Sequence, residues 1–335
     1  MLEFVPFIVG VAAILFIMPN YIKTMRKQKF VGKDLNKYSK PQVAELGGVI
    51  VFLGFSFAVF AAIFLATYLN AFSIELGLLL GGFSTIAMIA FIGLIDDIIG
   101  WKKGIRQWQH ALFPILAALP LMAISAGNTS MTLPFFGAIN FGIFYSLIII
   151  PIGITGASNA FNMLAGYNGL EAGQGIILTS TLTIIAFLSG HTTAMILGIA
   201  MIGALIGFLK FNWFPAKIFG GDALTLMVGA NIAVMSIIGN METFGVIVLA
   251  LFFVELFIKT KHRMQSECYG IPQKNGTLKA NPKGGSITQF ILNLGKGKYT
   301  EKGVVVRIFL IQIVICAVAF TIFYLNFAKV ILIPW

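Results

Sequence analysis

Long apolar stretches alternate with short polar ones along almost the whole chain. Ten such stretches can be separated, and they cover residues 3–19, 46–68, 73–95, 108–127, 139–157, 174–189, 192–208, 224–239, 241–259 and 304–327. A helix that crosses a bilayer needs about 20 mostly apolar residues. The pattern therefore predicts an all-α polytopic membrane protein with about ten transmembrane helices, folded as one membrane-embedded domain over residues 1–335.

Composition supports lipid as the main solvent of this chain. Hydrophobic residues make up 58% of the 335 residues and charged residues only 10%, whereas a soluble domain carries about 25% charged residues. The N-terminal sequence MLEFVPFIVG lacks a basic segment and a small-residue cleavage site. It is therefore expected to be a first transmembrane helix and not a removed signal peptide. The two cysteines predict neither a disulfide framework nor a zinc site.

The distribution of charge predicts an orientation. With ten spans and the N-terminus outside, every Lys and Arg except Lys329 falls in loops on one side. Cytoplasmic loops carry such an excess of basic residues, so the net charge of +11 is explained without nucleic acid. Both termini are then expected outside, and the cytoplasmic loops at about 20–45, 96–107, 158–173, 209–223 and 260–303. A functional surface is expected on this cytoplasmic side.

Two polar clusters stand out at predicted cytoplasmic helix ends. Asp96 and Asp97 follow an apolar run directly, and adjacent carboxylates at a membrane boundary are tolerable beside a divalent cation or basic groups. A solvated helix end is the alternative. Asn159 and Asn162 are three residues apart and so share a helix face, and Asn168 follows in a glycine-rich turn. Such a turn can present backbone amides to a phosphate, or it can be purely structural.

Two further clusters follow later in the chain. Asp222 stands at the start of an apolar helix, where it can bind a cation, cap the helix, or do both. Phe219 could stack on a base or anchor at the interface. Lys261, His262 and Arg263 form a compact basic group that suits phosphate, although an ordinary basic flank of a membrane helix would look similar.

Taken together, carboxylates, amides and a basic group on one side suit Mg²⁺ held jointly by protein and phosphates, with Mn²⁺ as an alternative cation. Phosphoryl transfer needs mainly positioning and neutralisation of charge. The chain has no GxxxxGK[ST], HExxH or GxSxG motif. A transporter would place charged groups near the bilayer midplane, but the spans are almost free of charge apart from Glu255. A non-catalytic lipid-binding scaffold would not need so many carboxylates and amides.

The same segments resemble a known family. The carrying segments are VGKDLNKYSKPQVAELGGVI (31–50), FIGLIDDIIG (91–100), NAFNMLAGYNGLE (159–171), FGGDAL (219–224) and KHR (261–263). Their order resembles that of the polyprenyl-phosphate N-acetylhexosamine-1-phosphate transferases, most of all the eukaryotic and archaeal dolichyl-phosphate N-acetylglucosamine phosphotransferases. This resemblance implies transfer of a sugar-1-phosphate from a UDP-sugar to dolichyl or polyprenyl phosphate in the membrane, first in a pathway of lipid-linked glycan assembly. The sequence does not decide whether the protein forms a homodimer.

The resemblance also implies roles for matching positions. It makes Asn162 and Asp222 the Mg²⁺ ligands, and it makes Asp96, Asp97 and Arg106 the catalytic group near the lipid phosphate. The implied substrate contacts are Leu35, Glu45, Asn159, Asn168, Phe219, Lys261, His262 and Arg263. Two departures concern the sugar pocket. Lys259, Thr260 and Lys261 stand where the eukaryotic branch tends to have Pro and Arg. Lys103 replaces an aromatic residue of the family, unless Trp101 takes its place. A bacterial-type undecaprenyl-phosphate transferase is the alternative, although Ala165-Gly166 stands where that branch often has Asp-Gly.

Overall fold

The computed structural model describes residues 2–100, 107–133 and 137–327 of the chain. After a short 3-10 turn, η1 (Leu2–Phe4), the helices are α1 (Val5–Lys27), α2 (Gly47–Leu69), α3 (Leu76–Gly100), α4 (Gln107–Ala117), α5 (Leu119–Ala123), α6 (Ile150–Met163), α7 (Leu170–Leu188), α8 (Thr192–Asn212), α9 (Asp222–Ile238), α10 (Glu242–Val248), α11 (Ala250–Lys261), α12 (Ile287–Gly295) and α13 (Glu301–Phe327). A wide helical turn, η2 (Tyr145–Ile149), leads into α6.

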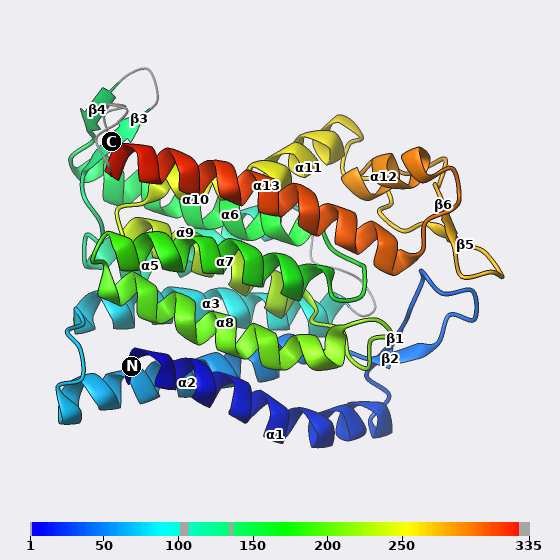
Figure 1. Ribbon diagram of the computed structural model, residues 1–335, viewed down its shortest axis with the longest axis horizontal. Helices are drawn as coiled ribbons and strands as arrows, with labels where there is room; N and C mark the ends of the chain where they lie inside the picture. Colours follow the sequence, from blue (N-terminus) through cyan, green and yellow to red (C-terminus); the bar gives the residue numbers. More distant parts are fainter. Residues whose placement is uncertain (1, 101–106, 134–136, 328–335) are drawn as a thin grey trace.

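Three antiparallel hairpins complete the fold. They pair β1 (Val31–Lys33) with β2 (Gln42–Ala44), β3 (Ser130–Leu133) with β4 (Gly137–Asn140), and β5 (Ile271–Pro272) with β6 (Leu278–Lys279). The long helices lie roughly lengthwise, so the molecule has two ends (Figure 1). The start of α1, the end of α13 and the β3–β4 hairpin lie at one end, and the other two hairpins with α12 lie at the opposite end.

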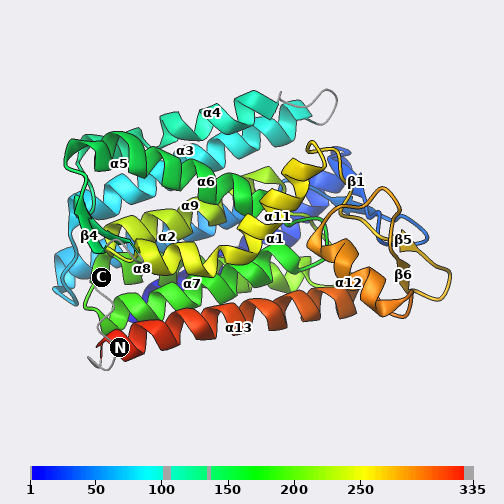
Figure 2. The ribbon, with the colours of Figure 1, turned by 90° about the horizontal axis from the view of Figure 1, so that it is seen from above.

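Helix α9 occupies the centre of the bundle. It contacts α2, α3, α6, α7, α8 and α10 (Figure 2), and every residue from Ala223 to Ile238 is buried. A helix that is apolar all round is expected in such a place. Its 17 residues extend only about 25 Å, less than the roughly 30 Å hydrocarbon core. Helix α9 is therefore too short to count as a full span by length alone.

Glycines allow the neighbouring helices to approach the start of α9. A Cβ on Gly48 of α2 would lie 2.5 Å from the Leu224 nitrogen, and one on Gly93 of α3 would lie 2.6 Å from the Ala223 nitrogen. Real Cβ atoms do not come so close to backbone, so only glycine permits these crossings. Because Gly93 is one helical turn from Asp97, the close crossing brings the paired carboxylates to the start of α9.

The protein is an integral membrane protein with several apolar helices. Within the described residues, seven helices are long and apolar enough to cross a membrane, or eight if α10 and α11, which bend by 58°, cross as one. Each of the ten apolar runs overlaps one helix or consecutive helices, although the run 139–157 begins in β4. However, residues Leu112–Ala123 and Asp222–Ile238 are shorter than a full span. The expected count of ten spans is therefore not confirmed.

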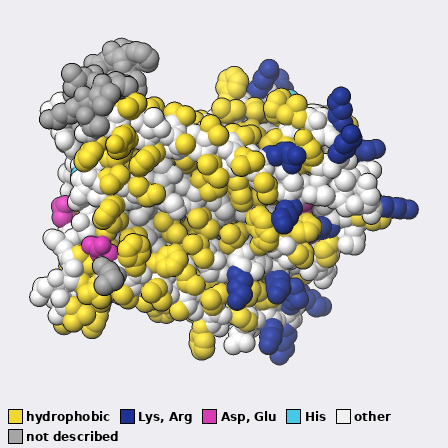
Figure 3. All heavy atoms as spheres, viewed as in Figure 1, with side chains coloured by type: hydrophobic (Ala, Val, Ile, Leu, Met, Phe, Trp, Pro, Cys, Tyr) yellow, Lys and Arg dark blue, Asp and Glu magenta, His cyan; other side chains and the backbone are white. Residues whose placement is uncertain are grey.

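Charge is divided between the two ends of the molecule. Lys and Arg side chains gather at the end that carries β1–β2, β5–β6 and α12, while an apolar belt covers the middle (Figure 3). The exposed Asp and Glu side chains in this view lie at the other end. The basic loops of the sequence thus meet at one end of the fold.

Candidate active site

A pocket opens at the basic end of the molecule, at the N-terminus of α9. Its walls come from four segments: the β1–β2 hairpin, the loop between α6 and α7, the loop between α8 and α9, and Tyr269 in the loop after α11. Of the predicted site residues, Leu35, Asn162, Phe219 and Asp222 line it. Segments nearly 240 residues apart in sequence therefore share one cavity.

Asp97 holds the first turn of α9. Its two carboxylate oxygens accept hydrogen bonds from the backbone nitrogens of Asp222 (2.7 Å) and Ala223 (3.1 Å). A carboxylate at a helix N-terminus satisfies unpaired N–H groups and interacts favourably with the helix dipole. Gly221 precedes the helix with φ +74°, and a Cβ there would lie 2.4 Å from Asp97 Oδ2. The capping role that the sequence allowed for Asp222 thus belongs to Asp97.

Asp222, freed from capping, faces other polar side chains. Its carboxylate is within hydrogen-bonding reach of the side chains of Asp96 and Asn162. Thr225, one turn further along α9, donates its hydroxyl to Asn162 Oδ1 at 2.8 Å. Two carboxylates so close together repel each other unless a proton or a cation lies between them. We call Asp96, Asp97, Asn162 and Asp222 the α9 cluster.

The predicted nucleoside contacts lie on two facing segments. Leu35 follows β1 and is 38% exposed, and Phe219 precedes α9. The Phe219 segment is fixed by backbone bonds: its nitrogen donates to Ala44 O, and its carbonyl accepts from Gly47 N, both at 2.8 Å. Glu45 lies beside this junction with its carboxylate over Gly32, and burial raises the pKa of Glu45 above its ordinary value. Glu45 does not line the pocket.

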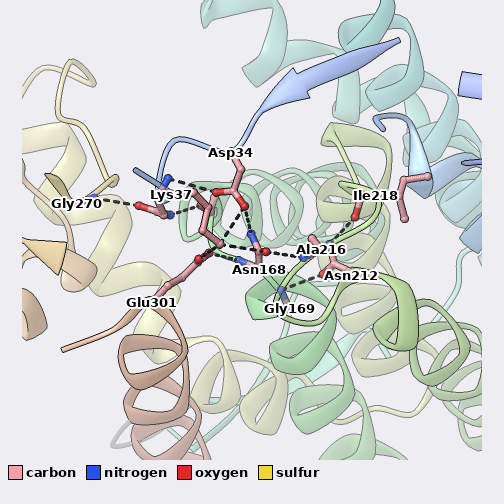
Figure 4. A network of polar contacts seen from close by, with 11 residues as sticks. Asp34, Lys37, Asn168, Gly169, Asn212, Ala216, Ile218, Gly270 and Glu301 are labelled. Atoms are coloured by element: carbon pink, nitrogen blue, oxygen red, sulfur yellow. Dashed lines mark hydrogen bonds and ion pairs between the residues drawn. The ribbon is translucent and has the colours of Figure 1, made fainter. Parts of the chain in front are cut away.

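Asn168 has a different environment from the one its predicted role implies. It is 3% exposed, and its Oδ1 accepts from the Ala216 nitrogen at 2.7 Å while its Nδ2 donates to Asp34 Oδ2 at 3.1 Å (Figure 4). Its own backbone nitrogen donates to Glu301 at 2.8 Å. The side chain thus joins three segments behind the pocket, and its contact with substrate stays a prediction.

Lys37 lies at the centre of this buried network. Its Nζ is 3.0 Å from Asp34 Oδ2 and pairs with Glu301, and it also lies 4.2 Å from the centre of the Phe214 ring. The side chains of Asp34 and Glu301 are 4% and 3% exposed. Figure 4 shows how the β1–β2 hairpin, the loop after α6 and the start of α13 meet here. We call Asp34, Lys37, Asn168 and Glu301 the Lys37 cluster.

The remaining predicted residues lie away from the pocket walls. Lys261, His262 and Arg263 end α11 and are exposed, and the His262 ring rests against Gly285. Asn159, one turn before Asn162, donates to the Thr155 carbonyl at 2.9 Å. Arg106 and Lys103 lie outside the described residues, so the predictions for them stay untested.

Sequence reasoning missed several residues of the pocket. Lys33, Glu171 and Tyr269 line it together with Thr225. Glu171, in the first turn of α7, accepts a hydrogen bond from the Gly166 nitrogen at 2.6 Å and so holds the glycine-rich turn. Glu171 could have been found from the sequence, because it is the first carboxylate after the glycine-rich turn at 165–169. Nothing in the local sequence around Tyr269 indicates that it reaches a pocket whose other lining residues lie between Lys33 and Thr225.

Comparisons with known proteins show the family of this chain. Residues 78–240 match the model of the family described as glycosyl transferase family 4. A protein of Saccharolobus solfataricus, named provisionally as a UDP-N-acetylglucosamine–dolichyl-phosphate N-acetylglucosaminephosphotransferase, is 38% identical over 83% of this chain and 84% of its own length. A Sulfolobus acidocaldarius protein with the same provisional name is 36% identical over 93% of both chains. A phospho-N-acetylmuramoyl-pentapeptide-transferase of Latilactobacillus sakei is 32% identical over 74% of this chain and 79% of its own length.

Proposed function

Because this chain belongs to glycosyl transferase family 4, we propose that it transfers N-acetylglucosamine-1-phosphate, or a related N-acetylhexosamine-1-phosphate, from a UDP-sugar to dolichyl or another polyprenyl phosphate. UMP is the second product. The observation that carries this proposal is the α9 cluster, in which carboxylates and an amide meet beside a pocket that Asn162 and Asp222 line. The names of the two archaeal relatives support the choice of donor and acceptor.

The membrane arrangement follows from the charge distribution. The basic end is proposed to face the cytoplasm, where the positive-inside rule places Lys and Arg, and ten spans with both termini outside satisfy this rule best. The UDP-sugar then enters from the cytoplasm, and the lipid phosphate reaches the pocket from the bilayer. The position of the pocket at the N-terminus of α9, at the basic end of the molecule, suits this meeting.

The reaction forms one bond and breaks one bond. A phosphate oxygen of the lipid attacks the sugar-bound phosphorus, and the bond from this phosphorus to the bridging oxygen breaks, so that UMP leaves with the electron pair. A phosphate monoester has a second pKa near 6 and is mostly ionised at pH 7, so no base is needed to activate it. Asp97 uses both oxygens to hold α9. Its role is therefore to position Asp222, while the Asp96 side chain faces the Asp222 carboxylate.

The α9 cluster fits a divalent cation. Asp222 faces Asp96 and Asn162, and a cation among them would relieve the repulsion between the two carboxylates. The described residues contain no closed group of three or more Asp, Glu, His or Cys ligands, which is the expected situation for Mg²⁺, since Mg²⁺ is usually held by one or two carboxylates together with substrate phosphates. When bound, Mg²⁺ would neutralise charge on the pyrophosphate, and Thr225 would keep Asn162 oriented toward it.

A transfer assay tests the proposal. Purified protein is mixed with radiolabelled UDP-N-acetylglucosamine, dolichyl phosphate and Mg²⁺, and both lipid-linked sugar phosphate and UMP are measured. We expect equal amounts of the two products, and none from Asp222→Ala protein. Parallel reactions with UDP-N-acetylgalactosamine, and with undecaprenyl phosphate as acceptor, define donor and lipid. Absence of UMP release with every donor and lipid tested would overturn the proposed function.

A further inference from the structure

Tyr269 reaches the pocket from a segment that the family comparison does not single out. It lies in the loop between α11 and α12, and it lines the pocket beside Gly166 and Asp222. The ring rests on Gly166: a Cβ there would lie 2.8 Å from Tyr269 Cε1 and 3.1 Å from its hydroxyl oxygen. Gly166 also has φ +101°. Only glycine fits both this backbone conformation and this contact, so Gly166 allows the Tyr269 ring to pack against the pocket wall.

The backbone on both sides of Tyr269 is held rigidly. The Cys268 carbonyl accepts hydrogen bonds from Tyr167 Oη (3.0 Å), Thr288 Oγ1 (2.7 Å) and Gln289 Nε2 (2.8 Å). Gln289 Nε2 also donates to the Tyr269 carbonyl at 2.8 Å. Thr288 and Gln289, on α12, are 0% and 3% exposed. The loop is therefore fixed at the residue that enters the pocket.

Asn36 links this loop to the opposite wall of the pocket. Its Oδ1 accepts from the Gly270 nitrogen at 3.2 Å, and its Nδ2 donates to the Gly166 carbonyl at 2.9 Å. Asn36 is 4% exposed and directly follows the pocket residue Leu35. One buried amide thus joins the β1–β2 hairpin, the glycine-rich turn and the Tyr269 loop, and the phenol is held at a fixed position relative to all three.

The charged side chains that line the pocket are mainly acidic, and this determines which groups can bind an anionic ligand. Asp34, Glu171 and Asp222 line the cavity, and Lys33 is the one basic side chain among its described lining residues. These carboxylates repel a phosphate group. An anionic ligand therefore needs neutral side chains in the wall that can donate hydrogen bonds to it. Burial, together with the charges of neighbouring carboxylates, raises the pKa of Tyr269 above its ordinary value. The phenol keeps its proton at neutral pH and can only act as a neutral group that donates or accepts.

We propose that Tyr269 is a substrate-binding residue whose hydroxyl donates a hydrogen bond to a phosphate oxygen of the nucleotide donor. This inference rests on the proposed function, because it assumes that the pocket holds a nucleoside diphosphate. A hydrogen bond to a charged group contributes about 1.5–3 kcal/mol. Loss of the hydroxyl should therefore weaken donor binding by about ten- to a hundredfold.

The decisive variant is Tyr269→Phe, which keeps the ring over Gly166 and removes only the hydroxyl. Tyr299→Phe is the matched control, since Tyr299 is a partly buried tyrosine at the same end of the molecule and does not line the pocket. Binding of UDP in the presence of Mg²⁺ is measured by calorimetry on the full-length protein. The KM values for donor and for lipid acceptor, and the thermal unfolding temperature, are measured alongside.

We expect Tyr269→Phe to raise the Kd of UDP and the donor KM at least about tenfold, while the acceptor KM and the unfolding temperature stay at the wild-type values. Tyr299→Phe should match wild type throughout. Unchanged UDP affinity in Tyr269→Phe would overturn the inference, and so would equal changes in both KM values together with a lower unfolding temperature. The UDP-binding arm does not depend on transfer, so a wild-type protein that binds UDP without transferring sugar would contradict the proposed function alone.

Discussion

The two acidic clusters at the basic end of this protein differ in how their charge is balanced. In the Lys37 cluster, Asp34 and Glu301 both pair with the Lys37 ammonium. In the α9 cluster, no Lys or Arg of the described residues forms an ion pair with Asp97 or Asp222. A buried carboxylate needs a countercharge, a proton or a set of donors. The first cluster carries its own cation, whereas the second relies on helix amides and leaves Asp222 facing Asp96.

This difference separates a structural site from a chemical one. The Lys37 cluster joins the β1–β2 hairpin, the loop after α6 and the start of α13, and both of its carboxylates are paired with Lys37. In the α9 cluster, Asn162 and Asp222 line the pocket, and we propose that the Asp222 carboxylate binds a cation there. The first cluster therefore holds loops together, whereas the second places a carboxylate and an amide against the cavity.

Substitution of Lys37 should have the largest effect on stability. Lys37→Met leaves two buried carboxylates without their cation, and breaking a buried ion pair in this way costs about 3–5 kcal/mol. We expect a correspondingly lower unfolding temperature in detergent, measured by differential scanning fluorimetry. The double variant Lys37→Met/Glu301→Gln should recover part of the loss, because one of the two carboxylates becomes neutral. If Lys37→Met is as stable as wild type, the two ion pairs contribute little to stability. The proposed difference between the two clusters would then be wrong.

Substitution of Asp222 should show the opposite pattern, with activity lost and the fold retained. Asp222→Ala removes the proposed cation ligand and also relieves the repulsion with Asp96. We expect turnover to fall at least about a hundredfold, or ~2.7 kcal/mol in the barrier, with an unfolding temperature equal to or above that of wild type. Asp96→Asn should lower turnover to a similar extent. Near-wild-type turnover of purified Asp222→Ala in the transfer assay would remove the cation site from the proposal.

Binding of the cation can be measured without the transfer reaction, from a shift in the unfolding temperature. A ligand that binds only the folded state stabilises it by an amount that grows with its concentration, about 2.7 kcal/mol at a hundred times its Kd. We expect Mg²⁺ with UMP to raise the unfolding temperature of wild type and of Lys37→Met, but not that of Asp222→Ala. Mn²⁺ should replace Mg²⁺. A shift of equal size in Asp222→Ala would show that the cation binds elsewhere.

Much of the α9 cluster could be predicted from the sequence, because its polar residues stand beside the ends of apolar runs that the charge pattern assigns to one side of the membrane. Asn162 and Asp222 reach the pocket for this reason. The Lys37 cluster could not be predicted, since Lys37 and Glu301 resemble ordinary basic and acidic flanks until the fold brings them together across 264 positions. The hydrogen bonds of Asn168 to Asp34 and Ala216 could not be predicted for the same reason, since both partners are distant in sequence. The count of ten spans is not confirmed, because Leu112–Ala123 and Asp222–Ile238 are apolar but shorter than a full span.

Thr225 offers the finest test of the difference between the clusters. Its hydroxyl donates a hydrogen bond to Asn162 Oδ1. None of the hydrogen bonds of this hydroxyl involves the Lys37 cluster, so substitution of Thr225 should affect only the cation site. We expect Thr225→Val to weaken the apparent affinity for Mg²⁺ about tenfold, or ~1.4 kcal/mol, with little change in unfolding temperature, because the valine has nearly the same volume. Thr225→Ser keeps the hydroxyl and should restore Mg²⁺ affinity, as measured from the Mg²⁺ dependence of UMP release. If both variants lose affinity equally, packing of the threonine methyl group positions Asn162, and the hydrogen bond does not.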